Sequence, residues 1–131
     1  MQTGQISKSK LWISWIMSGL VILFMLFDGI TKLMPPNEMI KASIDQLGYS
    51  VKHLPVMGTL GLISTVLYII PRTTILGAVL LTGYFGGAIA THVRVDNPLF
   101  SHVLFPVYLA ILMWGGLWLR NQSVRKFLLP V

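Results

Sequence analysis

A few ionisable side chains, set apart from the basic ends of the chain, could bind a polar ligand or exchange protons. Asp28 and Lys32 are four residues apart, so on a helix they would share one face and could form an ion pair. His92, Arg94 and His102 follow close together later in the chain. Lysine and arginine donate hydrogen bonds, and histidine ordinarily titrates near neutral pH. These residue types could together hold the oxygen atoms of a ligand.

Each of these residues also has a purely structural interpretation. Asp28 and Lys32 could simply tie down the end of a helix, and Arg94 is an alternative partner for Asp28. Arg94 and Asp96 could anchor a helix at a membrane surface, with His92 hydrogen-bonded to a neighbour. Both interpretations stay open, but we expect Asp28, His92 and Arg94 to point into the interior of the protein.

Several other chemistries are not expected. The chain has no cysteine, which excludes disulfides, thiolate metal sites and dithiol redox chemistry. No two of His53, His92 and His102 have ligand spacing on one helix, so we expect no metal. No nucleophile–base set, phosphate-binding loop or pair of carboxylates is visible. We therefore expect a protein that is not an enzyme on its own.

The composition indicates that lipid, not water, surrounds much of the chain. Of 131 residues, 54% are apolar and only 11% are charged. About a quarter of an ordinary soluble domain is charged, so this chain could not cover a globule with polar side chains. The net charge of +6 is spread near the ends of apolar runs and suits anionic lipid headgroups, and we expect no nucleic acid.

Four apolar stretches predict an all-α, single-domain membrane four-helix bundle. The predicted transmembrane segments are residues 11–33, 54–70, 75–93 and 99–119. Pro71 should end the second of these, with Thr73 or Thr74 capping the third. Pro106 should kink the fourth.

A short amphipathic helix over residues 37–47 is predicted between the first two segments. Asn37 can cap its beginning, its apolar residues recur at helical spacing, and Gly48 suits its end. The segment is too short and too polar to span, so we expect it to lie on the bilayer surface.

The charges of the loops predict the orientation. One side would carry six basic residues and no acid: Lys8, Lys10, Arg72, Arg120, Arg125 and Lys126. The other side would carry four basic residues together with acids, so the first side, with both termini, is predicted to be cytoplasmic. Asp28 and all three histidines then fall on the opposite side.

Small residues and one tyrosine stand out in the third segment. Gly83 and Gly87 form a small-xxx-small pair, which we expect to pack against a neighbouring helix within the bundle rather than to form a dimer. The hydroxyl of Tyr84 would lie near the middle of the membrane and needs a partner, either another helix or a ligand.

Several stretches resemble the DoxX-like family of small bacterial membrane proteins. They include Gly48-Tyr49 and the sequences LYIIPRT (67–73), LLTGYFGGAIATHVR (80–94), FPVY (105–108) and WGGL (114–117). The first segment is similar as well, in Gly29 and Lys32-Leu33. The resemblance covers almost the whole chain. It implies a likeness to the membrane subunit of thiosulfate:quinone oxidoreductase and to systems that cope with quinones and oxidative stress, but it supplies no catalytic residues.

These observations lead to one functional hypothesis and two alternatives. We expect a multi-pass protein of the bacterial cytoplasmic (inner) membrane that binds a lipophilic redox molecule such as a quinone. It would be a subunit or accessory of a membrane redox or stress-response system, as a homo-oligomer or beside a redox partner subunit. The alternatives are a non-catalytic scaffold or anchor for a partner protein, and an oligomeric transporter of a small solute. The expected ligand-binding residues are Asp28, Lys32, Tyr84, His92, Arg94 and His102.

Overall fold

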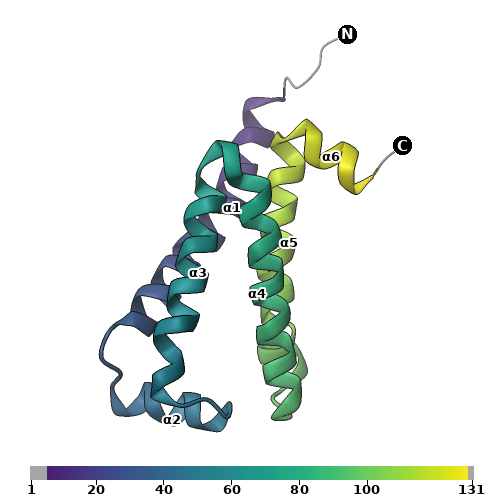
Figure 1. The fold of residues 1–131 in the computed structure, drawn as a ribbon. Helices are drawn as coiled ribbons and strands as arrows, with labels where there is room; N and C mark the ends of the chain where they lie inside the picture. The colour runs from purple at the N-terminus through teal and green to yellow at the C-terminus, as the bar shows by residue number, and fades with distance from the viewer. Residues whose placement is uncertain (1–5, 130–131) are drawn as a thin grey trace.

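The chain folds into helices joined by short turns (Figure 1). A computed structural model describes residues 6–129 and places no strand among them. The two chain ends, which are predicted to be cytoplasmic, lie outside this described part. The helices are α1 (Lys8–Leu33), α2 (Glu38–Gln46), α3 (Leu54–Ile69), α4 (Thr74–Arg94), α5 (Phe105–Arg120) and α6 (Gln122–Leu128). Two 3₁₀ turns, η1 (Val51–His53) and η2 (Pro71–Thr73), and a π-helical segment, η3 (Leu99–Val103), connect them.

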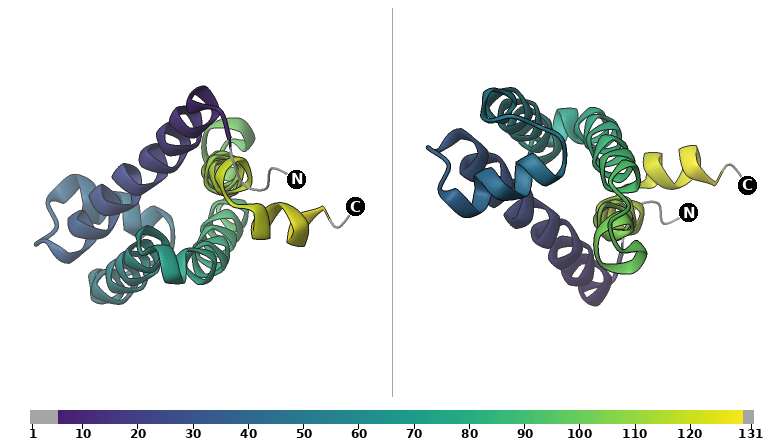
Figure 2. Two further views of the ribbon diagram at one scale, coloured as in Figure 1. Left: turned by 90° about the horizontal axis from the view of Figure 1, so that it is seen from above. Right: turned by 90° about the horizontal axis from the view of Figure 1, so that it is seen from below.

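Four long helices form a bundle around a common core. Helix α1 packs against α3 and α5, and α4 packs against the same two helices (Figure 2). The core is apolar and includes Val21, Met25, Tyr68, Leu81 and Met113. Many large apolar side chains nevertheless face outward, as a bundle surrounded by lipid requires.

Three helical stretches are long and apolar enough to cross a membrane. They are Lys8–Leu33, Pro71–Arg94 and Leu99–Arg120. Helix α3 is shorter and becomes a fourth candidate only together with α2, from which it is bent by 91°. The prediction of an all-α membrane helical bundle is confirmed, with three to four spans.

Helix α2 lies across one end of the bundle (Figure 1). As predicted, the side chain of Asn37 caps it by accepting a hydrogen bond from the Ile40 amide at 2.9 Å. Gly48 follows with a φ of +83°, a left-handed conformation that favours glycine. Local sequence signals therefore set both ends of this helix.

Thr73 takes the N-cap position of α4, as predicted for Thr73 or Thr74, but no side-chain hydrogen bond caps the helix there. The two threonine hydroxyls instead donate backwards to the last turn of α3, to the carbonyls of Leu67 (2.8 Å) and Tyr68 (2.9 Å). The reason is Pro71, which has no N–H and so cannot bond the Leu67 carbonyl as the next helical residue would. The threonine hydroxyls replace missing backbone donors at the end of α3.

Pro106 lies directly after a break in the helix of the fourth span, not inside a continuous α-helix. The backbone leaves the π-helical segment at Leu104, and Pro106 lies in the first turn of α5. Proline is favourable there because the first helical N–H groups have no partner within the helix.

Close contact between helices depends on glycines other than the predicted pair. A Cβ at Gly77 would collide with the backbone of Tyr68, and one at Gly58 would lie 3.0 Å from the Gly29 carbonyl oxygen. These positions let α4 and α1 approach α3. A Cβ at Gly83 or Gly87 would have no atom within 4 Å, so the expectation that this pair packs helices together was wrong.

A hydrogen-bonded chain ties three helices together at the end opposite α2. The Arg120 guanidinium donates to the Ser18 hydroxyl at 2.8 Å and lies over the Trp15 ring. The Tyr68 hydroxyl donates to the Met113 carbonyl oxygen at 3.2 Å. In the hydrogen bond of 2.7 Å between Tyr68 and Ser18, the serine hydroxyl is therefore the donor. Helices α5, α1 and α3 are linked in that order.

We expect Arg120→Met to destabilise the bundle. The variant keeps the apolar stem but removes a charged donor and a cation–π contact, so the free energy of unfolding should fall by about 2 kcal/mol. Unfolding in detergent titrated with SDS would measure this change. Lys126→Met, at an exposed position on α6, is the control and should change stability little. Equal stability of the two variants would contradict the role of the hydrogen-bonded chain.

Candidate functional site

A cavity of about 460 Å³ lies among the four long helices, near the end that α2 covers. The pair α1 and α3 diverges from the pair α4 and α5 toward this end (Figure 1). Ile44 and Leu47 bring the α2 segment into the wall, which is otherwise mostly apolar. The apolar lining includes Phe24, Met25, Met57, Leu60, Phe85, Phe105 and Leu109.

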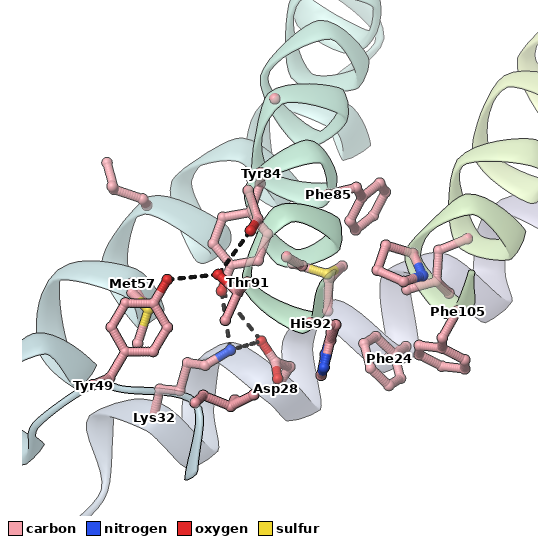
Figure 3. A pocket seen from close by; sticks show the side chains of 18 of the residues that line it. Phe24, Asp28, Lys32, Tyr49, Met57, Tyr84, Phe85, Thr91, His92 and Phe105 are labelled. Carbon is pink, nitrogen blue, oxygen red and sulfur yellow. Dashed lines mark hydrogen bonds and ion pairs between the residues drawn. The ribbon is translucent and has the colours of Figure 1, made fainter. Parts of the chain in front are cut away.

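Three polar side chains meet in this apolar wall (Figure 3). The Lys32 ammonium donates to the Asp28 carboxylate, as the spacing of the two residues predicted. It also donates to the Tyr84 hydroxyl at 3.0 Å, and that hydroxyl lies 3.4 Å from the Asp28 oxygen. We call Asp28, Lys32 and Tyr84 the polar cluster; it joins α1 to α4.

Sequence analysis missed a second polar contact in the wall. The Thr91 hydroxyl donates to the Gly87 carbonyl oxygen. In the hydrogen bond of 2.8 Å between Thr91 and Tyr49, the tyrosine hydroxyl is therefore the donor. Tyr49 follows Gly48 in one of the family-like stretches, and that was the only signal for it. The contact fastens the segment after α2 to α4.

Arg94 does not point into the cavity, so this expectation was wrong. Its guanidinium donates to the Leu47 carbonyl oxygen at 2.6 Å and is exposed. The alternative pairing of Arg94 with Asp28 is absent as well. The C-terminal carbonyls of α2 need donors, and Arg94 at the end of α4 supplies one. Arg94 therefore holds α2 over the end of the cavity.

His92 and His102, the two histidines predicted to bind a ligand, differ in position. His92 lines the cavity, and its Nδ1 accepts a hydrogen bond of 2.7 Å from the Asn97 amide, which leaves Nε2 to carry the proton of a neutral ring. His102 lies in η3, is exposed, and contacts His92 edge-on with ring centroids 5.7 Å apart. Among the described residues, no three potential metal-ligating side chains are grouped together.

Four of the six residues predicted to bind a ligand therefore share the cavity wall: Asp28, Lys32, Tyr84 and His92. Arg94 and His102 lie outside it. That any of them binds a ligand stays a prediction. The polar cluster offers an ammonium and a hydroxyl as donors beside a carboxylate acceptor, so it can bind an oxygen atom that accepts or donates hydrogen bonds.

The bundle and its cavity define a small multi-pass membrane protein with a polar cluster inside an apolar pocket. Comparison with known protein families matches residues 16–116 to the DoxX-like family. The chain belongs to this family. The matched residues include most of α1 and α5 and all of α2, α3 and α4, and therefore every helix that lines the cavity. Neither a search of curated proteins nor a search of solved structures found a match.

Proposed function

We propose that this membrane protein binds a quinone in the cavity, as a subunit or accessory of a membrane redox or stress-response system. The observation that carries the proposal is the polar cluster within an apolar wall. The protein would act in the bacterial cytoplasmic membrane, with both ends of the chain on the cytoplasmic side and a redox partner subunit beside it. It would not be an enzyme on its own.

The size and lining of the cavity suit a flat, mostly apolar ring. A volume of about 460 Å³ is within the range of small-molecule sites. Phe24, Phe85 and Phe105 offer aromatic surfaces against which a ring can pack. The few polar groups would then set the orientation of the bound ring.

The polar cluster can bind both forms of a quinone. A bound quinone supplies a two-electron redox centre whose oxygens accept hydrogen bonds when oxidised and donate them when reduced. Lys32 and Tyr84 are donors for the oxidised form, and Asp28 is an acceptor for the reduced form. His92, also in the wall, is a residue type that takes up and releases protons near neutral pH.

Quinone binding by the purified protein tests the proposal. Lipids extracted after purification in mild detergent should contain quinone, and added short-chain quinone should bind to the protein. Tyr84→Phe removes one neutral hydrogen bond, worth about 1 kcal/mol, and should weaken binding by roughly five- to tenfold. Tyr108→Phe is the matched control, because the Tyr108 hydroxyl donates to the Phe100 carbonyl and Tyr108 does not line the cavity. A protein that neither retains nor binds quinone would refute the proposal.

A further inference from the structure

We infer that the ligand enters the cavity sideways from the bilayer, through an opening between α3 and α4, and leaves its apolar chain in that opening. Leu60 of α3 and Gly83 and Gly87 of α4 bound the opening, which we call the lateral portal. The inference rests on the proposed function for the class of ligand, an amphiphile with a polar head and an apolar chain.

The three portal residues line the cavity and are also among the exposed residues of the bundle. Leu60 is 56% exposed, and both glycines are exposed. A Cβ at either glycine would have no atom within 4 Å. Exposed residues in the cavity wall, beside the empty space at both glycines, indicate that the wall is incomplete here. Here the outside is the lipid-facing side of two apolar helices.

The packing of the α3–α4 hairpin explains why the opening lies here. Near the connecting turn, Gly77 brings α4 against the backbone of Tyr68. Farther along, the helices separate (Figure 1), and the Tyr84 ring fills the space beside Gly61. On either side of Tyr84 along α4, Gly83 and Gly87 have no side chains that would fill the gap between the helices.

Two other approaches to the cavity, between α1 and α5 and at the α2 end, carry side-chain contacts across them. Between α1 and α5, the rings of Phe24 and Phe105 meet edge to face with centroids 5.1 Å apart. At the end of the bundle, the α2 segment is fastened to α4 through Tyr49 and Arg94. The portal has no such contact at its two glycines, and it leads to lipid rather than to water.

This arrangement favours ligands that carry both a polar head and an apolar chain. The polar head would reach Lys32 and Tyr84, while the chain would lie against Leu60 and over the bare backbone at the two glycines. A compact water-soluble solute has no apolar part to leave in such an opening.

Photolabelling in lipid nanodiscs tests the portal independently of quinone. A long-chain alcohol carrying a mid-chain diazirine should label Met57 and Leu60, as identified by mass spectrometry. In the double variant Gly83→Leu, Gly87→Leu, labelling of Met57 in the cavity wall should fall at least fivefold. Gly86→Leu is the matched control, because Gly86 is equally exposed and open but does not line the cavity. That variant should label like the native protein.

A second variant closes the portal after folding. Because the chain has no cysteine, Gly87→Cys can be alkylated with a dodecyl maleimide in the folded protein, with Gly86→Cys as its control. Alkylation at position 87 alone should reduce labelling of Met57. Unchanged labelling after closure, labelling centred on Phe24 and Phe105, or an unlabelled cavity in the native protein would each overturn the portal. Labelling as expected without any quinone binding would refute the quinone proposal alone.

Discussion

Lys32→Met should lower the free energy of unfolding by about 2–3 kcal/mol, because it leaves the Asp28 carboxylate without its cation in the wall of an apolar cavity. The side chains of Lys32 and Asp28 are only 22% and 26% exposed. The substitution would also remove the hydrogen bond that the Tyr84 hydroxyl accepts from Lys32. Unfolding in detergent titrated with SDS, together with quinone titration, would measure both losses.

Two further variants separate the loss of stability from the loss of binding. The double variant Asp28→Asn, Lys32→Met removes the stranded charge, so it should regain most of the stability but still bind quinone at least tenfold more weakly than the native protein. Lys41→Met is the control for a surface pair, since its partner Glu38 is 94% exposed, and it should cost less than about 1 kcal/mol. A double variant that binds quinone as the native protein does would exclude the polar cluster from ligand binding.

Gly77→Ala should destabilise the bundle by about 3 kcal/mol, the upper range for overpacking a well-packed interior. The added methyl group would collide with the backbone of Tyr68 and would lie 2.6 Å from the carbonyl carbon of Leu67. A backbone cannot move aside as the end of a flexible side chain can, so the α3–α4 hairpin would have to open. The same unfolding titration would measure the loss.

Gly86→Ala is the control for this substitution on the same helix. No atom lies within 4 Å of a Cβ at Gly86, so the substitution should be neutral or should stabilise the helix by up to about 1 kcal/mol. Similar losses for the two substitutions would show that the close approach at Gly77 is not what limits the packing.

Local features of the site could be predicted because they depend on residues near each other along the chain. The pairing of Asp28 with Lys32 follows from helical spacing alone. The cap at Asn37 and the left-handed turn at Gly48 follow from the residue types at the two ends of α2. The membrane character of the chain follows from composition, since too few polar residues exist to face water.

Tertiary structure decided which side chains from different helices meet. The sequence marked Tyr84 as a polar group in the membrane, but only the rotation of α4 against α1 brought it to Lys32. In the same way, Arg94 turned to the end of α2 and not to Asp28. An apolar helix surrounded by lipid on most sides carries a weak signal for its own rotation, because lipid-facing and buried residues are equally apolar.

The glycines of α4 show this division most clearly. The amino-acid sequence determined that Gly77, Gly83 and Gly87 lack side chains, and thereby where a close approach or an opening was possible. Packing against α3 decided that Gly77 meets a backbone whereas Gly83 and Gly87 border the cavity. The physical reason is that the use of a bare backbone depends on what lies opposite it, and that is a property of the folded bundle.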